Sequence, residues 1–175
     1  SSVTSNEFYH NTGAGFIGYF SAGGAAYGSA ARFLNVTIPA GSIITLANLQ
    51  VRRYVEQSLT VVNSRLRAQR HITPLTFSDY ADFDARTWTN AYVNWDAVEA
   101  FTNWETWYTS PDFYLAIQEV IDLPDWASGN PIAILWDDFQ QRSTQVANTY
   151  RSIYHYNDTP SRAPKLHIEY TAGGG

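Results

Sequence analysis

Residues 110–170 read SPDFYLAIQEVIDLPDWASGNPIAILWDDFQQRSTQVANTYRSIYHYNDTPSRAPKLHIEY, and this stretch decides the fold. Its first part has helix signals, because Ser110 is a good N-cap and Pro111 suits the first helical turn. Apolar side chains then recur at helical spacing, at Phe113, Ile117, Val120 and Ile121. Pro124 disfavours the α conformation in the residue before it. The sequence therefore predicts one short amphipathic helix, over about 111–123.

Three strands are predicted after this helix. Residues 132–136 form a short apolar run between turn residues, which is typical of a buried strand. Residues 150–156 alternate with a period of two, and residues 165–171 alternate more cleanly, with Leu166 and Ile168 on one side. Short strands separated by turns, with a single helix, favour a β-sandwich over alternating βα units.

Several short motifs occur in the order found in a known family. They are Phe33-Leu34-Asn35-Val36-Thr37-Ile38-Pro39-Ala40-Gly41-Ser42-Ile43, Ser110-Pro111-Asp112, Gln118-Glu119-Val120, Trp126-Ala127-Ser128-Gly129-Asn130 and Ala163-Pro164-Lys165-Leu166-His167-Ile168-Glu169-Tyr170. From about Ala31 to Tyr170, the chain resembles the DNRLRE-type domains. The resemblance implies a jelly-roll β-sandwich related to carbohydrate-binding modules, of the kind found in secreted bacterial proteins and phage-like structural proteins. It implies the fold more firmly than the function.

Composition limits the class of protein. A chain of 175 residues with 45% hydrophobic and 15% aromatic residues suits one domain with a sizeable core. There is no cysteine, which removes disulfides and thiolate chemistry. The net charge is −5 without a run of basic residues, so we expect no nucleic-acid partner. No apolar run approaches the roughly 18 residues needed to cross a bilayer, so we expect no membrane span.

The rest of the sequence completes a mainly β fold. Strands are predicted at 32–38 and 88–95, and the aspartate-rich residues 75–86 are predicted to form a long loop. We expect an antiparallel jelly-roll β-sandwich over residues 31–171, an N-terminal strand with a flexible connection over 1–30, and a tail over 172–175. The chain contains no methionine, even at position 1, and we expect a secreted, extracellular or surface-associated protein whose leader has been removed.

Catalytic motifs are missing from the sequence. It contains no nucleophile elbow, phosphate loop or histidine pair at metal spacing, so no catalytic residue is predicted. A glycosidase or lyase needs two facing carboxylates, and sequence alone does not place them. A group of aspartates offers the oxygen ligands that calcium prefers, with solvated loop acids as the alternative interpretation. This group comprises Asp79, Asp82, Asp84, Asp137 and Asp138. We expect no other cofactor.

Tryptophan side chains are candidates for carbohydrate stacking, because flat aromatic rings pack well on the faces of sugar rings. Trp95 and Trp136 lie in apolar alternation and are predicted to be core residues. The candidates for a stacking platform are Trp88, Trp104, Trp107 and Trp126. For each of them, a structural role is the alternative. Two N-x-[ST] patterns also make Asn35 and Asn157 candidate glycosylation sites.

Residues 13–20 point to self-assembly. This apolar, glycine-punctuated segment follows a polar one and is predicted to be an edge or terminal strand. Such a strand pairs within its own sandwich or completes the sheet of a neighbouring copy. Its assembly residues are Phe16, Ile17, Tyr19 and Phe20. We therefore expect a non-catalytic extracellular structural protein that polymerises head to tail by strand exchange. A carbohydrate-binding module is the alternative, and a glycan-active hydrolase or lyase is a third interpretation.

Overall fold

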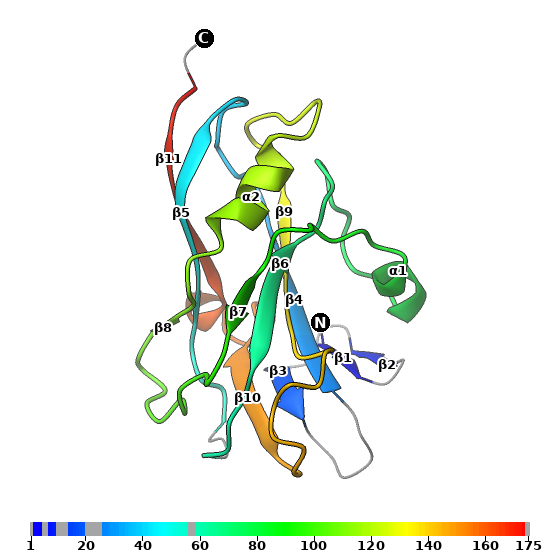
Figure 1. Ribbon diagram of the computed structural model, residues 1–175, viewed down its shortest axis with the longest axis vertical. Helices are drawn as coiled ribbons and strands as arrows, with labels where there is room; N and C mark the ends of the chain where they lie inside the picture. Colours follow the sequence, from blue (N-terminus) through cyan, green and yellow to red (C-terminus); the bar gives the residue numbers. More distant parts are fainter. Residues whose placement is uncertain (1, 5–6, 10–13, 20–25, 56–58, 174–175) are drawn as a thin grey trace.

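Two antiparallel β-sheets form the body of the protein in a computed structural model, which describes residues 2–4, 7–9, 14–19, 26–55 and 59–173 (Figure 1). The larger sheet has eight strands, six of them in the order β10-β3-β4-β9-β6-β7, and the smaller sheet has the order β11-β5-β8. With 36% strand and 11% helix, the chain is mainly β, and the expected sandwich-like fold is confirmed. Its jelly-roll connectivity stays a prediction.

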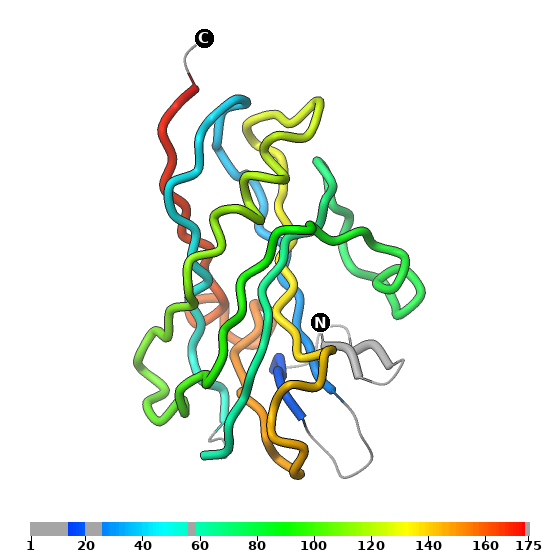
Figure 2. Tube along the Cα trace, in the orientation of Figure 1, coloured from blue at the N-terminus to red at the C-terminus, as the bar shows by residue number. Residues whose placement is uncertain are grey.

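The strands and helices follow one another along the chain. The strands are β1 (Ser2–Thr4), β2 (Glu7–Tyr9), β3 (Ala14–Tyr19), β4 (Ala26–Phe33), β5 (Ile43–Val51), β6 (Ser64–Ala68), β7 (Val93–Trp95), β8 (Tyr108–Thr109), β9 (Ile132–Asp137), β10 (Thr149–Tyr154) and β11 (Lys165–Thr171). The helices are α1 (Tyr80–Asp84), α2 (Tyr114–Ile121) and a short 3-10 helix, η1 (Pro160–Arg162). Figure 2 shows β11 running beside β5, and these two strands pair from Lys165↔Gln50 to Thr171↔Ile43.

Strand β9 is the centre of the larger sheet. It pairs with β4 over six residue pairs and with β6 over four, and every one of its own residues is buried. Its alternate side chains Ile132, Ile134 and Trp136 face the core between the sheets. The strand predicted at 132–136 is therefore confirmed, and its uniform apolarity reflects burial on both faces.

Helix α2 covers one end of the sandwich, against β5 and β6 (Figure 1). It buries Ala116, Ile117, Val120 and Ile121, which confirms the predicted amphipathic helix. Its start differs from the prediction, because the N-cap is Phe113 and has no side-chain cap hydrogen bond. Ser110 instead accepts a hydrogen bond from the Leu49 N–H at 2.9 Å, and so joins the chain to β5.

A second, smaller core lies on the outer face of the larger sheet. Phe77 and Phe83 pack there against Ala30, Ala133 and Leu135. The residues predicted to form a long loop at 75–86 therefore contain α1, and its Phe83 is held by the sheet. Two further boundaries differ from prediction: β4 begins at Ala26, inside the expected flexible connection, and it ends at Phe33.

Candidate functional site

Strand β3 is an interior strand, although it lies near the N-terminus. It pairs antiparallel with β10 along its whole length, from Ala14↔Tyr154 to Tyr19↔Thr149, and pairs with β4 at Gly18 and Tyr19. The prediction of an edge strand is therefore wrong, because β10, from much later in the chain, occupies the position outside it. We call the space between β10 and β4, which β3 fills, the β3 slot.

The assembly residues predicted in this segment fill the slot. Ile17 is fully buried and belongs to the main core, and Tyr19 is also buried. Phe16 is half-buried and packs edge-on against Tyr150, with ring centroids 5.4 Å apart. Phe20 lies outside the described residues. The described side chains of β3 therefore pack both into the core and against β10.

Close approach to β10 explains a glycine in this strand. Gly18 has a φ of 121°, a conformation that side chains disfavour. A Cβ atom there would also collide with the Thr149 carbonyl oxygen. At the other end of the strand, a Cβ on Gly15 would lie 2.5 Å from the Ser29 Oγ. The slot thus leaves no room for a side chain at Gly18, whereas a side chain at Gly15 would require the Ser29 and His155 side chains to move.

A buried arginine lies beside the slot, and sequence analysis missed it. Arg151 of β10 pairs with Ile17 and is only 2% exposed. Its guanidinium donates to the Glu99 carbonyl at 2.8 Å and to the Val98 carbonyl at 2.6 Å. Burial lowers the pKa of Arg151, and the charge of Glu99 opposes that shift. The only signal in the sequence was that Arg151 shares one face of a β-alternating segment with Ile153.

The β10 wall of the slot is held by contacts that do not involve β3. On its other side, the N–H groups of Tyr54 and Tyr154 donate to the Ser152 and Arg52 carbonyls, at 3.0 and 3.2 Å. Thr60 donates through its hydroxyl to that of Thr149 at 2.9 Å. Since β9 holds the β4 wall in the same way, both walls have partners besides β3.

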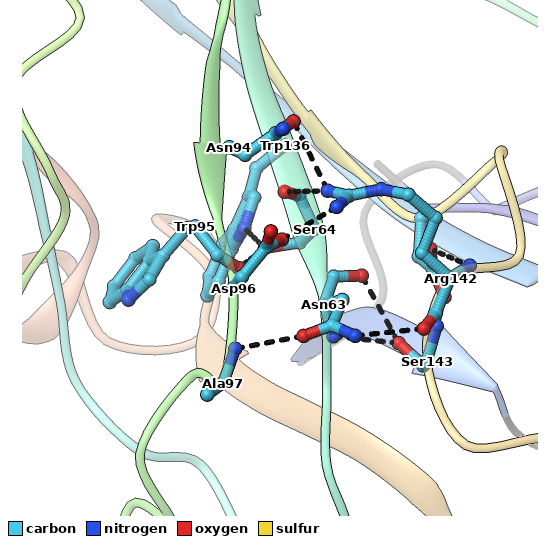
Figure 3. A network of polar contacts seen from close by, with 10 residues as sticks. Asn63, Ser64, Asn94, Trp95, Asp96, Ala97, Trp136, Arg142 and Ser143 are labelled. Atoms are coloured by element: carbon cyan, nitrogen blue, oxygen red, sulfur yellow. Dashed lines mark hydrogen bonds and ion pairs between the residues drawn. The ribbon is translucent and has the colours of Figure 1, made fainter.

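A polar network also fixes the segment that leads into β10 (Figure 3). Arg142 forms an ion pair with Asp96 at 2.7 Å and donates to the Ser64 carbonyl at 2.7 Å. Asn63 donates to the Arg142 carbonyl at 2.8 Å. Burial raises the pKa of Asp138, even though its carboxylate accepts hydrogen bonds from the Arg142 and Ser143 N–H groups. These contacts tie residues 138–143 to β6 and β7.

An apolar groove of about 730 Å³ lies beside β4. One wall comes from residues 29–34 and the other from the segment between His155 and Lys165, with buried apolar residues of both sheets between them. On the side of β4 away from β9, described strands pair only with residues 26–29. Among the described residues, the backbone edge at 31–33 therefore has no strand partner on the groove side.

The four candidate tryptophans do not form one platform. Trp126 is buried and donates its indole N–H to the Ile38 carbonyl at 3.0 Å, so its predicted surface role is wrong. Trp88 is half-buried and packs against Phe83 of the smaller core. Trp104 and Trp107 lie on the outer surface near β5 and β11, where cationic side chains cover part of their rings. Trp107 is half-buried like Trp88 and has both Arg52 and Lys165 over its ring, so of the four candidates Trp104 alone keeps the accessible character that stacking requires.

The candidate calcium ligands are divided between different roles. Asp79 caps α1 by accepting the Asp82 N–H at 2.9 Å, and Asp82 pairs with Arg86 at 2.7 Å. Burial alone would raise the pKa of Asp82, but hydrogen bonds from Arg86 and the Ser78 N–H lower it below its usual value. Asp137 binds two arginines on β6. In the described part of the chain, no three acidic or histidine side chains converge as a metal site, and calcium stays a prediction.

Comparisons with protein-family models, with curated proteins and with solved structures find no match to this chain. Its function is therefore inferred from the geometry of the chain itself.

Two further observations concern the surface. Asn35 and Asn157, the candidate glycosylation sites, are both exposed, and Asn35 has a φ of 53°. None of the helices in the described ranges is both long and apolar enough to cross a membrane.

Proposed function

We propose that this chain is a non-catalytic extracellular structural protein, a subunit of a fibre that assembles head to tail by exchange of β3. The observation that supports this function most directly is an interior strand supplied by a segment near the N-terminus. Both walls of the β3 slot have other partners, so they can receive the same strand from another copy. The resemblance to DNRLRE-type jelly-roll domains, which occur in secreted and phage-like structural proteins, agrees with this proposal.

Exchange of β3 retains its contacts. A β3 strand from another copy makes the same six pairs with β10 and buries the same Ile17 and Tyr19 side chains. The free-energy difference between the closed and exchanged forms then comes mainly from the connection to β4 and from the entropy of association. Donor strand and acceptor slot are different surfaces, so the contact is heterologous and repeats along a fibre.

A pair of introduced cysteines tests the exchange, and the chain has no cysteine of its own to interfere. Ala14 and Tyr154 are paired residues of β3 and β10, so the double variant Ala14→Cys, Tyr154→Cys places two thiols opposite each other. If β3 is exchanged, mild oxidation of fibres seen by electron microscopy is expected to give a ladder of covalent multimers on a denaturing gel.

The matched control is the double variant Ala31→Cys, Ile134→Cys, which joins β4 to β9 within one copy. It is expected to run as a monomer after the same oxidation. A monomer for the Ala14–Tyr154 variant as well contradicts exchange. A dimer without larger species indicates reciprocal exchange between two copies and contradicts a fibre.

Carbohydrate binding is the second candidate function, and the surface at Trp104 and Trp107 favours it. The Arg162 guanidinium lies 4.5 Å from the Trp104 ring centroid, and the Lys165 ammonium lies 4.1 Å from that of Trp107. Trp104 is 43% exposed. The cations of this surface, together with the exposed Trp104 ring, suit acidic sugars, which present both a charge and an apolar ring face.

Replacing Trp104 by alanine tests this second function. We expect retardation of the protein in gels containing an acidic polysaccharide, such as alginate, and loss of that retardation in the variant. The thermal midpoint is expected to stay the same, because Trp104 lies on the surface. Equal mobility of both proteins in gels with and without the polysaccharide contradicts carbohydrate binding.

A further inference from the structure

The groove beside β4 has the size and lining of a site for a small amphipathic ligand. Its volume of about 730 Å³ lies within the range of roughly 300–1,000 Å³ that is usual for such sites. Leu49 of the smaller sheet and Ile134 of the larger sheet both line it, so the groove reaches the space between the sheets. Ala31 and Phe33 form part of its wall. An alkyl chain in this groove is removed from water along its length.

The charged groups of the groove all have one sign. Arg32 and Lys165 line it, and none of the described residues that line it is an aspartate or glutamate. This differs from the chain as a whole, whose net charge is −5. The groove therefore favours a ligand with a negative charge.

Arg32 is the cation that such a ligand can pair with, because the Lys165 ammonium lies over the Trp107 ring, 4.1 Å from its centroid. Among the described residues, neither Arg32 nor Lys165 forms an ion pair with a carboxylate. Arg32 donates from Nη1 to the Thr76 hydroxyl at 3.3 Å, while its Nε is buried without a hydrogen-bond partner. Because this Nε atom is closed to solvent, an anionic ligand in the groove pairs with the terminal nitrogens of the guanidinium.

We propose that this groove binds a medium-chain carboxylate, which passes around the unpaired edge of β4, with its alkyl chain between the two sheets and its carboxylate paired with Arg32 on the outer face of the larger sheet. The alkyl chain contacts Ala31, Phe33 and Ile134, and the positive charge of Lys165 adds to the attraction. This site is separate from the β3 slot, and its occupation does not depend on fibre formation.

Calorimetric titration with decanoate, on the whole chain, tests the site. Decanoate is expected to bind, while decyltrimethylammonium, which has the same alkyl chain and the opposite charge, is expected not to bind. Arg32→Gln is expected to weaken decanoate binding about tenfold, because one charge-assisted hydrogen-bonded pair is lost. Arg70→Gln is the matched control, since Arg70 pairs with Glu119 outside the groove, and it is expected to leave the affinity unchanged.

A groove-filling variant, Ala31→Trp, tests the contribution of the apolar part of the groove to binding, independently of the Arg32 charge. It is expected to abolish decanoate binding, and thermal unfolding reports whether the variant is folded. If Ala31→Trp does not fold, the affinity of Arg32→Gln for decanoate decides the test. Equal affinities of wild type and Arg32→Gln, or equal binding of both decyl ligands, overturn the proposal. The proposal is also overturned if Ala31→Trp prevents polymerisation but leaves decanoate binding intact. That result would indicate that the groove holds a strand of a second copy and not an alkyl chain.

Discussion

Replacing Asp137 by alanine is expected to lower the free energy of unfolding by about 3 kcal/mol. Asp137 is fully buried and lies 3.2 Å from the Arg67 guanidinium and 3.7 Å from that of Arg65. Its carboxylate also accepts the Phe139 N–H at 3.0 Å. Without it, two guanidinium groups face each other in a site largely removed from water.

The surroundings of Asp137 explain why the effect is large yet limited. Burial lowers the pKa of Arg67, and the charge of Asp137 opposes that shift. The Arg65 and Arg67 side chains keep 14% and 18% of their surface exposed, so both can turn partly toward water in the variant. We therefore expect a loss near the lower end of the range for buried pairs.

Urea denaturation measures this loss, and a second ion pair supplies the control. Asp96 pairs with Arg142 at 2.7 Å, but its side chain is half-exposed. Asp96→Ala is expected to cost about 0.5 kcal/mol, as exposed pairs usually do. Similar losses for the two variants would show that the burial of Asp137 has no energetic consequence.

Replacing Trp136 by alanine is expected to cost about 3–5 kcal/mol, the range for deleting a large aromatic side chain from a core. Trp136 is among the largest fully buried side chains, and its ring stacks on that of Trp95 with centroids 4.8 Å apart. Its indole N–H donates to the Ser64 hydroxyl at 2.7 Å (Figure 3). The alanine variant loses the packing and leaves this hydroxyl without its donor.

A conservative variant separates these two contributions. Trp136→Phe keeps an aromatic ring but removes the indole N–H, and we expect a cost of about 1–3 kcal/mol for the hydrogen bond and the lost volume. Both variants are compared by chemical denaturation followed by far-UV circular dichroism. A loss for Trp136→Ala no larger than that for Trp136→Phe would contradict a packing role for this ring.

Local sequence patterns predicted the strands and the helix in which the apolar residues follow one clear periodicity. The apolar run at 132–136 became β9, and the alternation at 165–171 became β11. The helical spacing of Ile117, Val120 and Ile121 correctly predicted the buried face of α2. In these segments one periodicity dominates, and tertiary contacts agree with it.

Elements that depend on distant contacts were predicted less well. Ser110 has the chemistry of a helix cap, but the Leu49 N–H binds its hydroxyl instead. The loop predicted at 75–86 contains α1 because Phe83 finds an apolar surface at Ala133 and Leu135. Trp126 follows Asp125, yet it is buried in the main core, where the distant Ile38 carbonyl accepts its indole N–H.

The sequence predicted the strand of the candidate site but not the position of that strand within the sheet. The sequence predicted a strand within residues 13–20, whose role in assembly stays a prediction, but only the topology shows that β3 lies between β10 and β4. Sheet order depends on pairing between segments far apart in the chain, which periodicity does not encode. The groove escaped prediction for the same reason, since its walls come from residues 29–34 and from the segment between His155 and Lys165.

The interior position of β3 also has a consequence during synthesis. The ribosome makes β3 well before its partner β10, because β4 to β9 all lie between these two strands in the sequence. Contacts so distant in sequence form late, because closing a long loop costs entropy before any pairing compensates for it. Until then the backbone of this segment is hydrogen-bonded to water, and the segment can pair instead with β10 of a nearby chain.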